Sequence, residues 1–244
     1  MGIVIAVASG KGGTGKTSVT GGVAAALAMA GQRVLCIDMD IGLRNLDISL
    51  GLSDRALMDF ADVALGRCTL SRAAVRHPDL KELSLLTAPM ALPPSLSPYR
   101  VRSMLSAART LYDYILIDAP AGLGPGFQYA VCGADRALVV ATNDASSLRD
   151  AQRVVAELDW LPQVHLVMNR IQPKLLRKLR TTIDDAMNTA GLPLIGVIPE
   201  DAQVMLCANR GIPLTSQGRK GAAMACRNIA WRLMGRRIPI MRIR

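Results

Sequence analysis

A glycine-rich segment near the N-terminus constrains this chain more than any other feature. Residues Gly10–Thr17 read GKGGTGKT and directly follow the apolar run Ile3–Ala8. They fit the pattern G-x-x-x-x-G-K-[ST] of a phosphate-binding loop, which requires a strand before it and a helix after it. Glycines let the backbone fold so closely around an anion that successive N–H groups point inward. The segment therefore predicts a nucleotide-binding protein.

Each part of this loop has a predicted role in holding a nucleotide with Mg²⁺. A predicted helix over 17–30 directs its positive N-terminal end at the phosphates. Lys16 would reach the β- and γ-phosphates, and the Thr17 hydroxyl would hold the metal. The predicted nucleotide-binding residues of the segment are Gly10, Lys11, Gly12, Gly13, Thr14, Gly15, Lys16, Thr17 and Ser18.

Short aliphatic runs alternate with helical patterns along the whole chain. They predict strands at 3–8, 33–38, 83–87, 114–118, 137–142, 164–169 and 194–198, and helices at 17–30, 98–111, 146–159, 175–190, 202–210 and 221–234. Repeated strand–helix–strand units predict an α/β fold: a single-domain, doubly wound, mostly parallel sheet flanked by helices, of the P-loop NTPase type. The predicted nucleotide-binding domain spans 1–235, and 236–244 form a short basic and apolar tail.

The composition supports a folded protein with an anionic partner. Half of the residues are apolar and only 3% are aromatic, which predicts an aliphatic core and excludes disorder as the main state. The net charge of +10 invites a nucleotide, a nucleic acid or a membrane surface. Five cysteines without metal-ligand spacing, and no secretory signal or apolar run long enough to span a membrane, predict a cytoplasmic protein that is at most peripheral at the inner face of the membrane.

Carboxylates end two of the predicted strands. Residues 38–47 read DMDIGLRNLD, and Asp118 closes the aliphatic run 114–118. Beside a Mg-nucleotide, such carboxylates can hold the metal or its water and orient an attacking water. An aliphatic strand that ends on aspartate is the Walker B pattern, which predicts that Asp118 anchors Mg²⁺.

A second lysine in the loop, Lys11, makes it resemble the deviant Walker A motif K-G-G-x-G-K-T of the MinD/ParA family of ATPases. The resemblance implies that Lys11 crosses a dimer interface, touches the phosphates bound by the other subunit and, with Lys16, stabilises charge in the transition state. ATP would then form part of the contact between two subunits, and hydrolysis would loosen it.

The segment 38–47 closely resembles the first switch region of the MinD branch, and Asp118–Gly122, which read DAPAG, resemble the second. The resemblance implies that Asp40 holds the attacking water and that Asp38 lies near the metal. The predicted catalytic residues are Lys11, Lys16 and Asp40, and the predicted Mg²⁺ residues are Thr17, Asp38 and Asp118.

Two strand-end segments further along the chain resemble the part of the family site that binds the base. The resemblance implies that Asn169 reads the adenine edge, for which an amide has a suitable donor and acceptor. The predicted base-binding residues are Asn169, Arg170, Pro199, Glu200 and Asp201. Ordinary strand-end loops are the alternative interpretation. No guanine-specific motif is present, so ATP and ADP are favoured.

The resemblance also implies partners. MinD-type ATPases form an ATP-bound homodimer, hydrolyse ATP slowly, and place the division septum through protein partners that inhibit ring assembly or stimulate hydrolysis. The start of the helix near Ser146 and Ser147 could serve such partners or be a simple N-cap.

The tail Arg236–Arg244 could bind an anionic membrane, although it is shorter than the usual anchor and Pro239 disfavours a helix. A tail that is disordered or folded against the domain is the alternative.

Three other functions remain open from the sequence. A ParA-like partition ATPase would bind DNA through Lys174, Arg177, Lys178 and Arg180, although a solvated helix face explains that cluster and nucleic acid is the less favoured partner. A flagellar-number regulator of the same family usually carries a different segment after the second strand. A nucleotide-gated interaction module would use turnover only incidentally.

Overall fold

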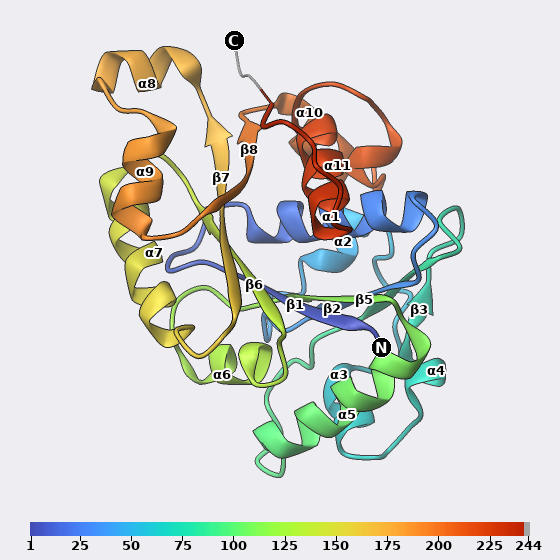
Figure 1. Cartoon of the computed structure of the whole chain (residues 1–244). Coiled ribbons are helices and arrows are strands. Elements are labelled where there is room, and N and C mark those ends of the chain that lie inside the picture. The colour runs from blue at the N-terminus through green and yellow to red at the C-terminus, as the bar shows by residue number, and fades with distance from the viewer. Residues whose placement is uncertain (242–244) are drawn as a thin grey trace.

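The computed structural model describes residues 1–241 and is built on one eight-stranded sheet (Figure 1). The strand order is β3-β4-β2-β5-β1-β6-β7-β8. All neighbours pair in parallel except β3 and β4. The strands are β1 (Ile3–Ala8), β2 (Val34–Asp38), β3 (Val75–Arg76), β4 (Leu83–Leu86), β5 (Tyr114–Asp118), β6 (Arg136–Ala141), β7 (Gln163–Ile171) and β8 (Leu194–Pro199). The predicted fold class is confirmed.

Helices cover both faces of the sheet (Figure 1). One face carries α1 (Lys16–Met29), α2 (Leu46–Leu50), α10 (Ala202–Asn209), the 3₁₀ turn η1 (Leu214–Ser216) and α11 (Gly221–Leu233). The other carries α3 (Phe60–Ala64), α4 (Leu70–Ala73), α5 (Pro98–Leu111), α6 (Pro125–Val131), α7 (Ala145–Glu157) and α9 (Ile183–Ala190). The short helix α8 (Pro173–Leu179) buries none of its residues and extends beyond the sheet. None of the helices within 1–241 is long and apolar enough to cross a bilayer.

Alternation along the central strands divides the interior into two cores. In β1, Val4 and Ala6 belong to the core under α5 and α7, whereas Ile5 and Val7 belong to the core under α1 and α11. A parallel strand that is buried on both faces therefore reads as a continuous aliphatic run. Helices α1 and α11 approach each other closely at Gly22, where a Cβ would crowd the sulfur atom of Cys226.

The seven predicted strands and five of the six predicted helices are confirmed within two residues at each end. The predicted helix over 175–190 is wrong, because the segment forms α8 and α9. Arg180 adopts a left-handed conformation (φ 52°), and Thr182 then caps α9 in a reciprocal capping box with Asp185. Strand β3 and the short helices α2, α3, α4 and α6 were not predicted. The five cysteines are free.

The turn after α2 supplies a stability test. Gly51 has φ 68°, and a Cβ there would overlap the carbonyl oxygen of Gly211, which follows α10. Gly66 also has positive φ (74°) but faces open space. A left-handed residue other than glycine costs roughly 1–2 kcal/mol, so Gly66→Ala should lower the melting temperature by about 2–8 °C. Gly51→Ala should lower it by at least twice as much in calorimetry, and equal losses would contradict the close approach of the two turns.

Candidate nucleotide-binding site

The phosphate-binding loop lies between the carboxyl end of β1 and the first turn of α1, as predicted. Gly13 and Gly15 have φ values of 79° and 87°, a left-handed conformation that glycine adopts without strain. A Cβ at Gly10 would overlap the backbone of Asp150 in α7, whereas one at Gly12 or Gly13 would meet only open space. The loop is therefore packed on one side and open on the side where phosphates would enter.

Several polar groups around the loop lack partners that a phosphate would supply. Helix α1 has no side-chain N-cap and no acidic residue in its first turn, so its first N–H groups are available to an anion. The hydroxyl of Thr14 is buried without a hydrogen-bond partner among the described residues. Lys16 is only 7% exposed, and it takes part in none of the ion pairs found within 1–241. Buried polar groups are normally satisfied, so these residues fit a bound polyphosphate.

Two buried carboxylates face each other on neighbouring strands. Asp38 of β2 and Asp118 of β5 are paired in register, and each is 1% exposed. Asp38 accepts hydrogen bonds from the backbone N–H groups of Asp40 (2.9 Å) and Leu46 (3.0 Å). Asp118 accepts one from the hydroxyl of Thr20 at 3.1 Å.

Burial makes these carboxylates unusually basic. It raises the pKa of Asp38 to about 6, although the hydrogen bonds from Asp40 and Leu46 act in the opposite direction. Burial, followed by the nearby charge of Asp38, raises the pKa of Asp118 to about 7, against the hydrogen bonds from Thr17 and Thr20 and the charge of Lys16. A bound cation would favour the ionised form of both groups.

The donor set fits Mg²⁺ held jointly with a nucleotide. Nowhere in the described chain do three or more His, Cys, Asp or Glu side chains converge as a metal cage would require. Magnesium is usually bound by one or two carboxylates together with substrate phosphates. Asp38 and Asp118, together with the Thr17 hydroxyl, which is near enough to lower the pKa of Asp118, provide such a partial set.

A cavity of about 500 Å³ adjoins the loop, and every residue predicted to bind the base lies in its wall. The predicted residues in its wall are Gly13, Gly15, Ser18, Asn169, Arg170, Pro199, Glu200 and Asp201. The remaining wall is mostly apolar and was not predicted: it includes Val19, Val204, Met205, Leu214 and Cys226. An apolar pocket with a few polar groups at its rim suits a nucleoside.

Two of these residues bond to the loop itself. The Asn169 amide donates to the carbonyl of Thr14 (2.8 Å). Arg170, at φ 57°, donates to the carbonyl of Gly13 (3.3 Å) and pairs with Glu200 (2.9 Å). The ends of β7 and β8 are thereby tied to the phosphate loop. Adenine recognition by Asn169 stays a prediction.

Lys11 is held by α7. Its ammonium donates to Asp144 Oδ1 (2.7 Å) and to the Ser146 hydroxyl (2.8 Å). Burial alone would raise the pKa of Asp144, but hydrogen bonds from Lys11, Ser146, Thr142 and Ser147 lower it well below its usual range. The predicted N-cap of this helix is corrected: Asp144 caps it by accepting from the Ser147 N–H, while Ser147 Oγ accepts from the N–H of Thr142.

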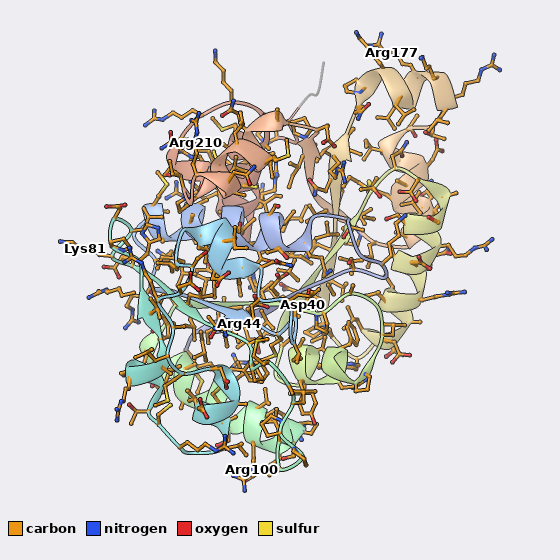
Figure 2. The ribbon with its side chains drawn as sticks, turned by 180° about the vertical axis from the view of Figure 1, so that it is seen from behind. Asp40, Arg44, Lys81, Arg100, Arg177 and Arg210 are labelled. Atoms are coloured by element: carbon orange, nitrogen blue, oxygen red, sulfur yellow. The ribbon has the colours of Figure 1, made fainter. Side chains whose placement is uncertain are left out.

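Asp40 begins the loop between β2 and α2 and is half-buried (Figure 2). Its carbonyl accepts hydrogen bonds from Leu43 and Arg44, and Arg44 (φ 49°) reaches the Thr87 hydroxyl after β4 (3.2 Å). In Figure 2, Asp40 lies near the middle of the molecule, whereas Arg177 lies at its periphery.

Three contributors to the site were not predicted from the sequence, although two of them have a local signal in it. Thr20 lies one helical turn after Lys16, so it shares that face of α1. Asp144 directly precedes a predicted helix, where aspartate is a common N-cap. The apolar wall formed by Val204, Met205 and Leu214 had no such signal, because it depends on how α10 and η1 pack.

A family model and similar curated sequences point to the same protein family. The CobQ/CobB/MinD/ParA nucleotide binding domain matches residues 5–214. The septum site-determining protein MinD of Bacillus subtilis is 37% identical over 246 residues, with 98% of this chain and 92% of that protein covered. MinD of Helicobacter pylori is 39% identical over 249 residues, with the same coverage.

Solved structures agree. MinD in a MinC:MinD cell division protein complex from Aquifex aeolicus superposes with a TM-score of 0.91 at 37% identity, covering 98% of each chain. MinD from Pyrococcus horikoshii, complexed with Mg-ADP, superposes with a TM-score of 0.83 at 29% identity, covering 96% of each chain.

The raised pKa values of the two carboxylates predict how stability depends on pH. Their ordinary value is near 3.8, so the folded protein retains protons that the unfolded chain has released. Stability without Mg²⁺ should therefore fall as the pH rises from about 4 to about 7.

Asp118→Asn removes one of these groups. In EDTA, the melting temperature of the unaltered protein should fall by at least about 3 °C more than that of the variant between about pH 5 and about pH 8. Calorimetric scans would show this, and parallel pH profiles for the two proteins would contradict it.

Proposed function

Because this chain belongs to the CobQ/CobB/MinD/ParA family of nucleotide-binding proteins, we propose that it dimerises with Mg-ATP and that hydrolysis controls its reversible attachment to a membrane surface. The chain is an ATP-hydrolysing P-loop enzyme of the MinD type. The names of its relatives favour septum placement over DNA partition or control of flagellar number. The observation that carries the proposed dimer is Lys11, a cation that the loop does not need in order to hold its own nucleotide.

The proposed roles of the nucleotide-binding residues follow from their positions. Loop amides and Lys16 bind the phosphates, since α1 has no side-chain N-cap and Lys16 forms no ion pair among the described residues. Thr17, Asp38 and Asp118 would hold Mg²⁺, and the bound metal would supply positive charge beside the phosphates. The 500 Å³ cavity takes the base and sugar, with Asn169, Arg170, Pro199, Glu200 and Asp201 at its polar side.

Hydrolysis needs a positioned water and a cation at the developing charge. We assign the water to Asp40, which is half-buried at the start of the loop after β2. We assign the cation to Lys11 of the opposite subunit, in the role of an arginine finger. In the single chain Lys11 is paired with Asp144 and Ser146, so this role requires that it leave them.

The proposed result of the ATP cycle is control over where in the cell the protein attaches to the membrane. Residues 1–235 form the ATPase domain, and 236–244 form a tail whose arginines would attract anionic lipids at the inner face of the cell membrane. Two tails in a dimer would bind much more tightly than one. The MinC:MinD complex supports a protein partner from the division-site system.

The two loop lysines should have separable functions. Lys16→Ala should weaken ATP binding by about 100-fold or more, because it removes a charged contact to the phosphates. Lys11→Ala should leave ATP binding nearly unchanged but prevent ATP-dependent dimerisation. Calorimetric titration and light scattering would measure the two properties, with Lys81→Ala as a control for the loss of one exposed lysine (Figure 2). Normal dimerisation of the Lys11 variant would refute the crossed lysine.

Sedimentation with anionic liposomes, and in parallel with plasmid DNA, tests the proposed surface. The proposal predicts ATP-dependent binding to liposomes at physiological salt, with little binding in ADP. Truncation after Gly235 should abolish it while leaving ATPase activity intact. ATP-dependent binding to DNA instead would support the partition function, and binding to neither would refute direct membrane attachment.

A further inference from the structure

The chain after α11 turns back and runs along β8 toward the end of the molecule that carries α8 and α10 (Figure 1). One side chain, Arg232, connects the domain to this returning segment. Its guanidinium donates to the carbonyls of Ile195 in β8 (2.7 Å), Ile238 (3.0 Å) and Pro239 (2.6 Å). Two of the three acceptors thus belong to the tail.

The position of Arg232 follows from an irregularity in the sheet. β8 is an edge strand, and its register with β7 shifts between the pairs Leu166–Leu194 and Val167–Gly196. The shift leaves Ile195 as an extra residue of β8, and its carbonyl accepts from Arg232. Arg232 has no acidic partner among the ion pairs of the described residues, so backbone carbonyls are what compensate its partial burial.

The tail then reaches an apolar groove of about 470 Å³ between α8, α9 and the ends of β7 and β8. Leu176, Ile183, Met187 and Val197 line it, and Ile240 and Met241 complete its wall. Ile240 is 40% exposed, and Met241 also packs against the core under α11. The apolar side chains of the tail are therefore partly withdrawn from solvent.

We propose that this groove is the docking site of the chain's own segment 238–241, that Arg232 fastens the segment there, and that docking competes with insertion of the same side chains into a membrane. The competition rests on the proposed membrane attachment, whereas the docking does not. The segment cannot occupy both places, since Ile240 and Met241 would form the apolar contact in each.

Two arginines of the tail remain accessible while its apolar side chains are docked in the groove. Arg236 and Arg237 are exposed in the docked tail and form no side-chain hydrogen bond among the described residues. They remain able to attract an anionic surface while the apolar residues are held back. Docking would then permit a weak electrostatic encounter and oppose stable insertion, which needs both kinds of contact.

Arg232→Gln tests the fastening. It removes the guanidinium that bonds Ile238 and Pro239, and Arg210→Gln is a control of equal charge change at an exposed arginine (Figure 2). Although Arg236 and Arg237 are exposed, trypsin must also bind the residues that follow the cleaved bond, so cleavage there requires the docked segment 238–241 to open. Release of the C-terminal peptide can be followed by mass spectrometry. Loss of a charged hydrogen bond should raise that rate by about ten-fold in the Arg232 variant and leave the control unchanged.

Met187→Ser tests the groove without altering the tail. It should also accelerate release of the peptide, and it decides the matter if Arg232→Gln fails to fold by circular dichroism. Both variants should bind vesicles of equimolar phosphatidylglycerol and phosphatidylcholine more tightly than the unaltered protein, by up to the same factor as the gain in cleavage rate.

The outcomes separate the two ideas. Unchanged cleavage in both variants would overturn docking, whatever the vesicles show. Faster cleavage without tighter vesicle binding would overturn the competition. Absence of ATP-dependent vesicle binding in every protein, including the unaltered one, would count against the proposed membrane attachment and the competition, and docking would then stand or fall on the cleavage rates alone.

Discussion

The site depends on a pair of carboxylates that the fold buries side by side, neither of which forms an ion pair with another described residue. Asp38 and Asp118 end neighbouring parallel strands in register, and each is 1% exposed. Desolvation of two like charges is costly, and the raised pKa values of both groups reflect that cost. The aliphatic cores on both faces of the sheet fix the strands, so the carboxylates cannot move apart. Lys16, which is 7% exposed and forms no ion pair with another described residue, completes a site whose charges are balanced only when a metal and phosphates join them.

The same burial organises the loop that carries Asp40. Asp38 accepts the N–H groups of Asp40 and Leu46, which bracket the segment between β2 and α2. The conformation of that segment is thereby tied to the charge on Asp38, and so to whatever binds beside it. Its far end continues into α2, where Gly51 lies against Gly211 after α10, and α10 forms part of the base pocket. Phosphate, metal and base regions therefore share one connected frame.

Site residues in the glycine-rich loop or at the ends of strands could be predicted from the sequence. Contacts that depend on how helices pack against the sheet could not. The loop at Gly10–Thr17 and the carboxylates that end β2 and β5 were predicted, because strand ends converge in a parallel sheet. The break at Arg180 was missed because apolar periodicity continues across it, although Thr182 and Asp185 form a capping signal. The partner of Lys11 could not be predicted, because Asp144 is distant in sequence and only the packing of α7 brings it near.

The end of β7 connects two sites that the sequence gives no reason to associate. Arg170 bonds the phosphate loop at Gly13 and pairs with Glu200, while the next residue, Ile171, lines the groove that holds the tail. The N–H of Glu200 donates to the carbonyl of Ile171 (3.0 Å). The ion pair and the groove wall are therefore joined by a direct backbone hydrogen bond. A nucleotide that displaced the Arg170–Glu200 pair would therefore directly affect the position of Ile171 in the groove wall, since no other helix or strand lies between them in this chain of contacts.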